Sequence, residues 1–71
     1  METGENRLRE FRLLRGFTQE ELARRVQVAR QTINLIEAGK YNPSLKLCLA
    51  ICQQLQVTLN DIFWMEGKSD V

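Results

Sequence analysis

The sequence predicts an all-α fold of five short helices, and two kinds of pattern predict it. In residues 19–38, apolar residues recur at the i, i+3, i+4 spacing of amphipathic helices, in two segments separated by a break too short for a loop. Thr18, Ser44 and Thr58 each stand directly before an apolar-periodic segment, at the N-cap position that hydroxyl side chains favour. The expected helices span residues 6–15, 19–26, 29–38, 45–55 and 59–64.

The first expected helix ends at a glycine, because Gly16 takes the left-handed conformation of a helix C′ residue at little cost. Its apolar residues are expected to face the core: Leu8, Phe11, Leu14 and, in part, Leu13. The second helix opens with Thr18 and Glu21, the spacing of a capping box.

The second and third helices form one unit in which the apolar residues face inward. Leu22, Ala23 and Val26 make one stripe, and the methyl side chain of Ala23 permits a close helix crossing. Ile33 and Ile36 make the inward stripe of the third helix. This spacing predicts a helix-turn-helix, whose second helix, residues 29–38, enters the major groove of DNA.

The outward face of this recognition helix carries side chains that can read base edges. Arg30 suits guanine O6 and N7, although a phosphate contact without sequence information is the alternative, and Gln31 suits adenine or a phosphate. Asn34 lies one turn on from Arg30 and is a third candidate. Thr32 either contacts a thymine methyl or a phosphate, or caps the helix locally. Leu35 either contacts thymine methyls or rests on the protein.

The start of the recognition helix differs from the other helix starts. Ala29 stands at the N-cap and offers no side-chain acceptor, which costs on the order of 1 kcal/mol relative to serine. The first amides of the helix are therefore free, and a phosphate could occupy them. Lys40, Tyr41 and Asn42 follow the helix and are expected to contact the phosphate backbone on its other side.

The last two expected helices carry more apolar residues than one buried stripe needs. The residues expected inward on the fourth helix are Leu45, Cys48, Ile51, Cys52 and Leu55, and Leu47 and Leu49 widen the arc. Phe63, Trp64 and Met65 are too many large apolar groups for one side of a short helix. Residues 59–65 are therefore a candidate dimer element. A two-fold dimer would place two recognition helices about 34 Å apart on a pseudo-palindromic operator.

Length and composition limit the classes of function. The 71 residues suit a single domain, 1–71, with an ordered core over about residues 6–65. Net charge is only +1, but most of the cations lie in the first forty residues, as a DNA-binding half requires. There is no histidine, no glycine-rich phosphate loop and no apolar run of membrane-spanning length. We therefore expect no enzyme activity, cofactor, metal site, small-molecule ligand or membrane span. We expect the two cysteines to be structural and the protein to be cytoplasmic.

The segments FTQEELA and IEAGKYNPSL, on either side of the tight break, resemble the lambda-repressor-like family of helix-turn-helix regulators, also called the xenobiotic-response-element family. The resemblance runs from about Leu8 to Phe63 and implies a compact five-helix DNA-binding domain. It implies that Gln19 contacts a phosphate and that Arg12 and Glu37 form an internal ion pair. Gln27 departs from the family, which usually has glycine in this turn.

The sequence thus predicts a small, homodimeric transcriptional regulator that binds double-stranded DNA sequence-specifically. The rival hypothesis is a protein-interaction module of the same fold, such as an antitoxin or antirepressor, because a fold does not fix a function. The low net charge and Leu35 favour the rival slightly. The salt dependence of DNA binding distinguishes the two hypotheses.

Overall fold

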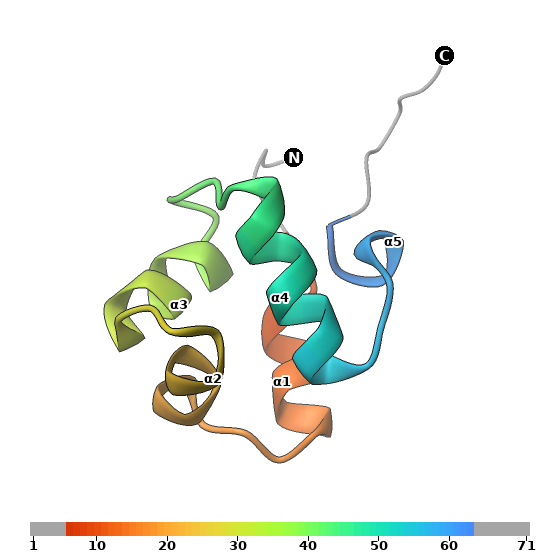
Figure 1. Ribbon diagram of the computed structural model, residues 1–71, viewed down its shortest axis with the longest axis horizontal. Coiled ribbons are helices and arrows are strands. Elements are labelled where there is room, and N and C mark those ends of the chain that lie inside the picture. The colour runs from red at the N-terminus through yellow and green to blue at the C-terminus, as the bar shows by residue number, and fades with distance from the viewer. Residues whose placement is uncertain (1–5, 64–71) are drawn as a thin grey trace.

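The computed structural model describes residues 6–63, and all regular secondary structure in this range is helical. The helices are α1 (Leu8–Leu14), α2 (Gln19–Val26), α3 (Arg30–Glu37), α4 (Leu45–Leu55) and α5 (Leu59–Ile62). Figure 1 shows α4 in the middle of the fold, with α2 and α3 on one side and α5 on the other. The predicted five-helix, all-α fold is confirmed over the described range.

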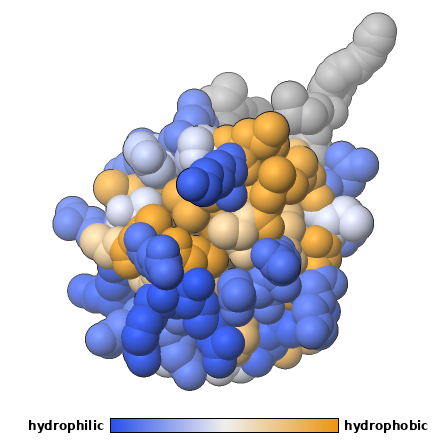
Figure 2. Space-filling model, in the orientation of Figure 1, coloured by the Kyte–Doolittle hydropathy of each residue, from blue (hydrophilic) through white to orange (hydrophobic). Residues whose placement is uncertain are grey.

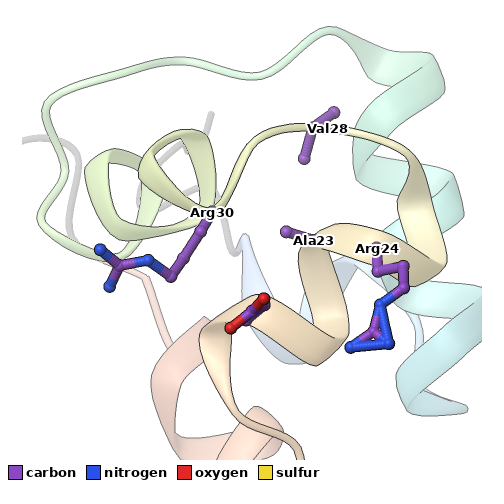
Figure 3. A pocket seen from close by; sticks show the side chains of 5 residues that line it. Ala23, Arg24, Val28 and Arg30 are labelled. Carbon is purple, nitrogen blue, oxygen red and sulfur yellow. The ribbon is translucent and has the colours of Figure 1, made fainter.

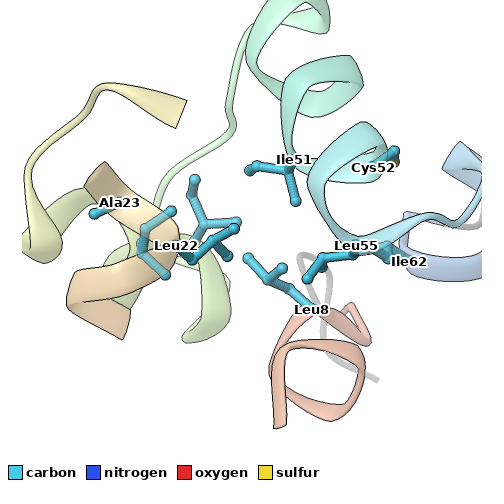
Figure 4. Packing of buried hydrophobic residues seen from close by; sticks show 9 residues of the cluster. Leu8, Leu22, Ala23, Ile51, Cys52, Leu55 and Ile62 are labelled. Atoms are coloured by element: carbon cyan, nitrogen blue, oxygen red, sulfur yellow. The ribbon is translucent and has the colours of Figure 1, made fainter. Parts of the chain in front are cut away.

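Every helix contributes to one hydrophobic core (Figure 4). The large side chains with no exposed surface are Leu8, Leu22, Ile33, Ile36, Ile51, Leu55 and Ile62. Burial of each such side chain contributes on the order of 2 kcal/mol, so this cluster is the main source of stability. The core therefore holds α3 against the other helices by its inward face.

Two leucines that were expected inward, Leu14 and Leu45, lie on the surface, and for these the prediction was wrong; Leu13, expected inward only in part, is exposed as well. Leu13 is 56% exposed, Leu14 69% and Leu45 64%. On α1 the buried stripe consists of Leu8 and Arg12, with Phe11 half-buried beside it, so the last two leucines turn outward. Leu45 occupies the first turn of α4, nearly two turns before the helix enters the core at Ile51 and Cys52.

Helix boundaries differ from the expected ones mainly at the two ends of the chain. Helix α1 begins at Leu8 because the Asn6 Oδ1 accepts a hydrogen bond from the Leu8 backbone N–H at 3.0 Å. Helix α5 ends at Ile62, and the predicted dimer residues Trp64 and Met65 lie outside the described residues.

The two cysteines lie on α4, and both thiols are free. Cys52 is buried in the core as expected, whereas Cys48 is only half-buried and its Sγ contacts the Pro43 carbonyl oxygen at 3.9 Å. Burial raises the pKa of both thiols, so they stay protonated and pack as small apolar groups.

No helix within residues 6–63 combines the length and the hydropathy that a membrane crossing requires.

Candidate DNA interface

The turn between α2 and α3 is tight because its backbone hydrogen bonds close on α2 itself. Gln27 takes the left-handed conformation, with φ 63° and ψ 46°, and ends α2. The next residue, Val28, donates its N–H to the carbonyl oxygen of Ala23 at 3.0 Å. Ala23 is 2% exposed, so its methyl side chain lies where the two helices pack, as expected.

Helix α2 begins with the predicted capping box. The Thr18 hydroxyl accepts a hydrogen bond from the Glu21 backbone N–H at 2.9 Å, and Glu21 Oε1 accepts one from the Thr18 backbone N–H at 3.2 Å. This reciprocal pair fixes the start of α2 and thereby the position of Gln19, its first residue.

An open pocket of about 410 Å³ lies between α2 and the start of α3. Its lining residues are Glu20, Ala23, Arg24, Val28 and Arg30. Figure 3 shows Arg30 extending away from α2 and Arg24 extending from α2 beyond Ala23. Both side chains line the pocket, and only that of Arg30 belongs to α3.

The outward face of α3 is polar and open to solvent, as the recognition-helix prediction requires. Arg30, Gln31 and Asn34 are exposed, and Thr32 and Leu35 are half-buried. The opposite face is fixed in the core by the buried side chains of α3. The three exposed residues carry hydrogen-bond donors and acceptors of the kind that reads base edges.

The start of α3 lacks a side-chain cap. Ala29 has an extended backbone at the N-cap position, and no side chain there accepts a hydrogen bond from the helix. The Thr32 N–H is bound by the Ala29 carbonyl oxygen at 3.0 Å, which leaves the amides of Arg30 and Gln31 without an intrahelical partner. With no acidic residue in this first turn, the positive end of the helix dipole is open to an anion.

The segment after α3 turns sharply away from the helix. Gly39 takes a left-handed φ of 73°, and Lys40 donates its backbone N–H to the Leu35 carbonyl oxygen at 2.9 Å. The side chains of Lys40, Tyr41 and Asn42 are exposed, and that of Tyr41 is 47% exposed. They are available to contact an external partner.

Arg12 of α1 and Glu37 of α3 form the ion pair that the resemblance implied. Arg12 Nε donates to Glu37 Oε2 at 2.6 Å, and the two side chains are 8% and 6% exposed. Removal of one partner would leave a charge stranded in the interior, at a cost of several kcal/mol. The pair therefore fixes the end of the candidate recognition helix against α1.

Gln19 is half-buried, and its side chain is already engaged. Its Nε2 donates a hydrogen bond to Glu37 Oε1 at 3.0 Å. The start of α2 and the end of α3 are therefore linked by side chains. The expected phosphate contact of Gln19 has to be compatible with this bond.

Apolar side chains are exposed on α4, beside the polar Lys46 and Gln53, whereas the surface around the two helices of the turn is mostly polar. Figure 2 shows hydrophobic side chains gathered in the upper part of this view and hydrophilic ones below. On α4, Leu45 and Leu49 are 64% and 50% exposed. Phe63, a predicted dimer residue, is half-buried and packs against the core. Apolar side chains open to a partner thus lie on α4, as they also do at the end of α1.

Three long-range contacts escaped the sequence analysis. Arg15 Nε donates to the carbonyl oxygen of Leu55 at 2.6 Å and so satisfies the end of α4. The Arg25 guanidinium stacks on the Phe17 ring, 4.5 Å from its centre, and Asn6 Nδ2 donates to the Ile36 carbonyl oxygen at 2.9 Å. No local sequence pattern predicts such contacts, because the hydrogen-bond partners of Asn6 and Arg15 are 30 and 40 residues away along the chain.

Comparisons with known proteins agree on the class of this fold. Residues 8–62 match the family described as Helix-turn-helix. The chain is 44% identical, over 64 residues, to the uncharacterised HTH-type transcriptional regulator YgzD of Bacillus subtilis, which covers 90% of this chain and 97% of that protein. An HTH-type transcriptional regulator of Archaeoglobus fulgidus is 51% identical over 62 residues, covering 87% and 89% of the two chains.

A solved structure is similar as well. The restriction-modification controller protein C.AhdI from Aeromonas hydrophila superposes with a TM-score of 0.73 and is 33% identical. The match covers 78% of this chain and 80% of that one. The family match and the structural match thus both cover most of the described residues.

Proposed function

Since the chain belongs to the Cro/C1-type helix-turn-helix family of DNA-binding transcriptional regulators, we propose that it binds a pseudo-palindromic operator as a homodimer, with α3 in the major groove. The observation that carries this proposal is the bare polar face of α3 above a fully buried apolar face. We further propose that the protein acts in the cytoplasm, where the chromosome of a bacterial or archaeal cell lies.

Base reading is assigned to the exposed residues of α3. Arg30 can donate two hydrogen bonds to guanine O6 and N7, and each good bidentate pair discriminates between bases by roughly 1–3 kcal/mol. Gln31 and Asn34 carry amides that can pair with adenine N6 and N7. Thr32 and Leu35 are half-buried at the edge of this face, where their methyl groups can contact a thymine methyl.

Phosphate contacts are assigned to both sides of the recognition helix. Gln19 is the first residue of α2, where the first backbone amides have no intrahelical acceptor, and Glu20 and Glu21 in the same turn oppose the helix dipole, so this contact is assigned to hydrogen bonding. The exposed side chains of Lys40, Tyr41 and Asn42 lie directly after α3 and supply a cation and two further donors. These contacts fix the position of α3 on the duplex without reading its sequence.

Self-association is assigned to the apolar surface at the C-terminal half. Leu45 and Leu49 are exposed on α4, and a chain of this size gains stability from covering such residues. Phe63, Trp64 and Met65 extend the apolar sequence beyond α5. We propose that a two-fold axis at this end places the recognition helices about 34 Å apart, one turn of DNA.

Selection of bound sequences from a random DNA pool tests the proposal directly. We expect a motif with two-fold symmetry that changes when Arg30→Ala or Gln31→Ala replaces the wild type, with a loss of roughly 1–3 kcal/mol on the original site. Arg9→Ala is the matched control, because Arg9 is equally exposed but lies on α1. An unchanged motif in both α3 variants would contradict the assignment of the reading residues.

The salt dependence of binding distinguishes a DNA-binding role from the protein-interaction role. About six phosphate contacts would make the affinity for DNA fall steeply, by about a thousandfold, between 50 and 200 mM salt. A shallow dependence, together with no enrichment of any motif, would instead favour an antitoxin-like or antirepressor-like module.

A further inference from the structure

Glu37 joins three helices through its two carboxylate oxygens. Oε2 accepts a hydrogen bond from Arg12 Nε at 2.6 Å. Oε1 accepts one from Arg12 Nη2 at 3.3 Å and a second from Gln19 Nε2 at 3.0 Å. Since Arg12 Nη1 also donates to the Phe17 carbonyl oxygen at 2.8 Å, the guanidinium and hence the carboxylate are held on several sides.

This arrangement determines which way the Gln19 amide faces. A carboxylate can only accept hydrogen bonds, so Gln19 must turn its nitrogen, not its oxygen, toward Glu37. A primary amide nitrogen carries two N–H groups in one plane, and Glu37 takes one of them. The second N–H is left for another acceptor, on the residue that begins α2.

The charge of Glu37 does not oppose an anion at this place. The Arg12 guanidinium neutralises the carboxylate at hydrogen-bond distance, and both side chains are almost fully buried. A phosphate near Gln19 therefore meets no net charge from this pair. The acids beside it are Glu20 and Glu21 of the first turn of α2, so the contact relies on the hydrogen bond from Gln19 and not on the helix dipole.

We propose that Glu37 is a positioning residue for DNA binding, which acts through Gln19. It holds the Gln19 amide in the one orientation in which the second N–H donates to a DNA phosphate, so that this side chain is ordered before DNA arrives. The benefit is entropic, because a free glutamine side chain would have to be ordered upon binding. This inference rests on the proposed phosphate contact of Gln19 and adds that the buried ion pair of the fold sets the geometry of that contact.

A double-mutant cycle measured on DNA binding tests the proposal. Gln19→Met keeps the length of the side chain but removes its donors. The background Arg12→Met/Glu37→Met removes the carboxylate together with its partner charge, because apolar replacement of a whole buried pair usually preserves the fold. The dissociation constant is measured with a mixed-sequence DNA duplex in low salt, since phosphate contacts need no operator.

We expect Gln19→Met to weaken binding about tenfold in the wild type and less than about twofold in the methionine background. The Arg12 charge is missing from the methionine background both with and without Gln19→Met, so its effect on DNA affinity cancels in the cycle. Gln53→Met, an exposed glutamine on α4, is the matched control and should leave the affinity unchanged in both.

An equal loss from Gln19→Met in both backgrounds would overturn the proposal, because the amide would then find the phosphate without Glu37. No loss in the wild type, with DNA still bound, would overturn it as well and leave the proposed function intact. Failure of the wild type to bind any duplex would instead reject the proposed function itself.

A second variant keeps the proposal falsifiable if the methionine background does not fold. Glu37→Asp keeps a negative charge for Arg12 but shortens the side chain by one methylene, which withdraws the carboxylate from Gln19. We expect Gln19→Met to cost less than about twofold in affinity in this background too, and a tenfold cost there would overturn the proposal.

Discussion

The turn before α3 and the turn before α5 have almost the same backbone. Gln27 and Gln56 both end a helix in the left-handed conformation, with φ of 63° and 61°. A valine follows each of them and donates its N–H to a carbonyl oxygen of the preceding helix at 3.0 Å: Val28 to Ala23 and Val57 to Cys52. Both valines pack against the core.

The two turns differ in the chemistry of the helix that follows. Before α5, the Asp61 carboxylate accepts hydrogen bonds from the backbone N–H and the hydroxyl of Thr58, at 2.8 and 3.1 Å. Before α3, Ala29 offers no acceptor, and the first turn contains no acid. The same turn therefore produces a closed helix start in one place and an open one in the other.

This difference separates a structural helix start from one that is available to a ligand. At α5 the Asp61 carboxylate binds Thr58 and places a negative charge at the positive end of the helix, which opposes an anionic ligand, so the residues there act on stability. At α3 the missing cap lowers stability but leaves amides and a helix dipole for a phosphate beside Arg30 and Gln31. The comparison implies that changes at Ala29 act on DNA binding and changes at Asp61 on folding.

Closing the open start should have the largest effect. We expect Ala29→Asp to stabilise the fold, because the carboxylate caps α3, and to weaken DNA binding at least about tenfold by repelling the phosphate. Ala29→Ser is the matched control: it should raise the free energy of unfolding by about 1 kcal/mol with a smaller loss of affinity. Denaturant unfolding and DNA titration measure the two effects, and unimpaired binding by the aspartate variant would refute an anion site at this helix start.

Relaxing the shared left-handed residue should have a smaller effect, equal in the two turns. Backbone strain at an L-residue in this conformation destabilises the fold by on the order of 1 kcal/mol. Glycine removes the strain, but it also raises the conformational entropy of the unfolded chain, which offsets part of the gain. We expect Gln27→Gly and Gln56→Gly each to raise the free energy of unfolding by about 0.5 kcal/mol. Gln53→Gly, inside α4, should instead lower it by about 1 kcal/mol. If Gln27→Gly and Gln56→Gly changed the free energy of unfolding in opposite directions, the two turns would not be equivalent.

Of the two helix starts, acid should weaken only that of α5, which has a carboxylate, and the contribution of Asp61 to stability should be the smallest of these effects. Hydrogen bonds from the backbone N–H and hydroxyl of Thr58 lower the pKa of Asp61 below its ordinary value of 3.8. A carboxylate with a lowered folded-state pKa stabilises the fold above its unfolded-state pKa, and this contribution disappears as the pH falls through the folded-state pKa. Thermal melts should show Asp61→Asn less stable than the wild type at neutral pH and equal to it in strong acid. A difference that persists in acid would contradict this origin.

The fold and the exposed face of α3 could be predicted because their signals are local. Capping at Thr18 and Ser44 is visible over three residues, and the structure contains both hydrogen bonds, from Glu21 and from Leu47. The inward stripes of α2 and α3 follow from helical periodicity in the same way. The wrong assignments of Leu14 and Leu45 arose because periodicity gives one stripe but cannot show where a helix leaves the core.

The sequence by itself determined which residues of α3 face outward, because helix geometry and the burial of Ile33 and Ile36 leave them no other direction. Only the tertiary structure decided that Gln19 meets Glu37 and that Arg15 reaches the end of α4. Such contacts join residues that are far apart along the chain, so they depend on how whole helices pack, and helix packing is set by the complete core rather than by any local pattern.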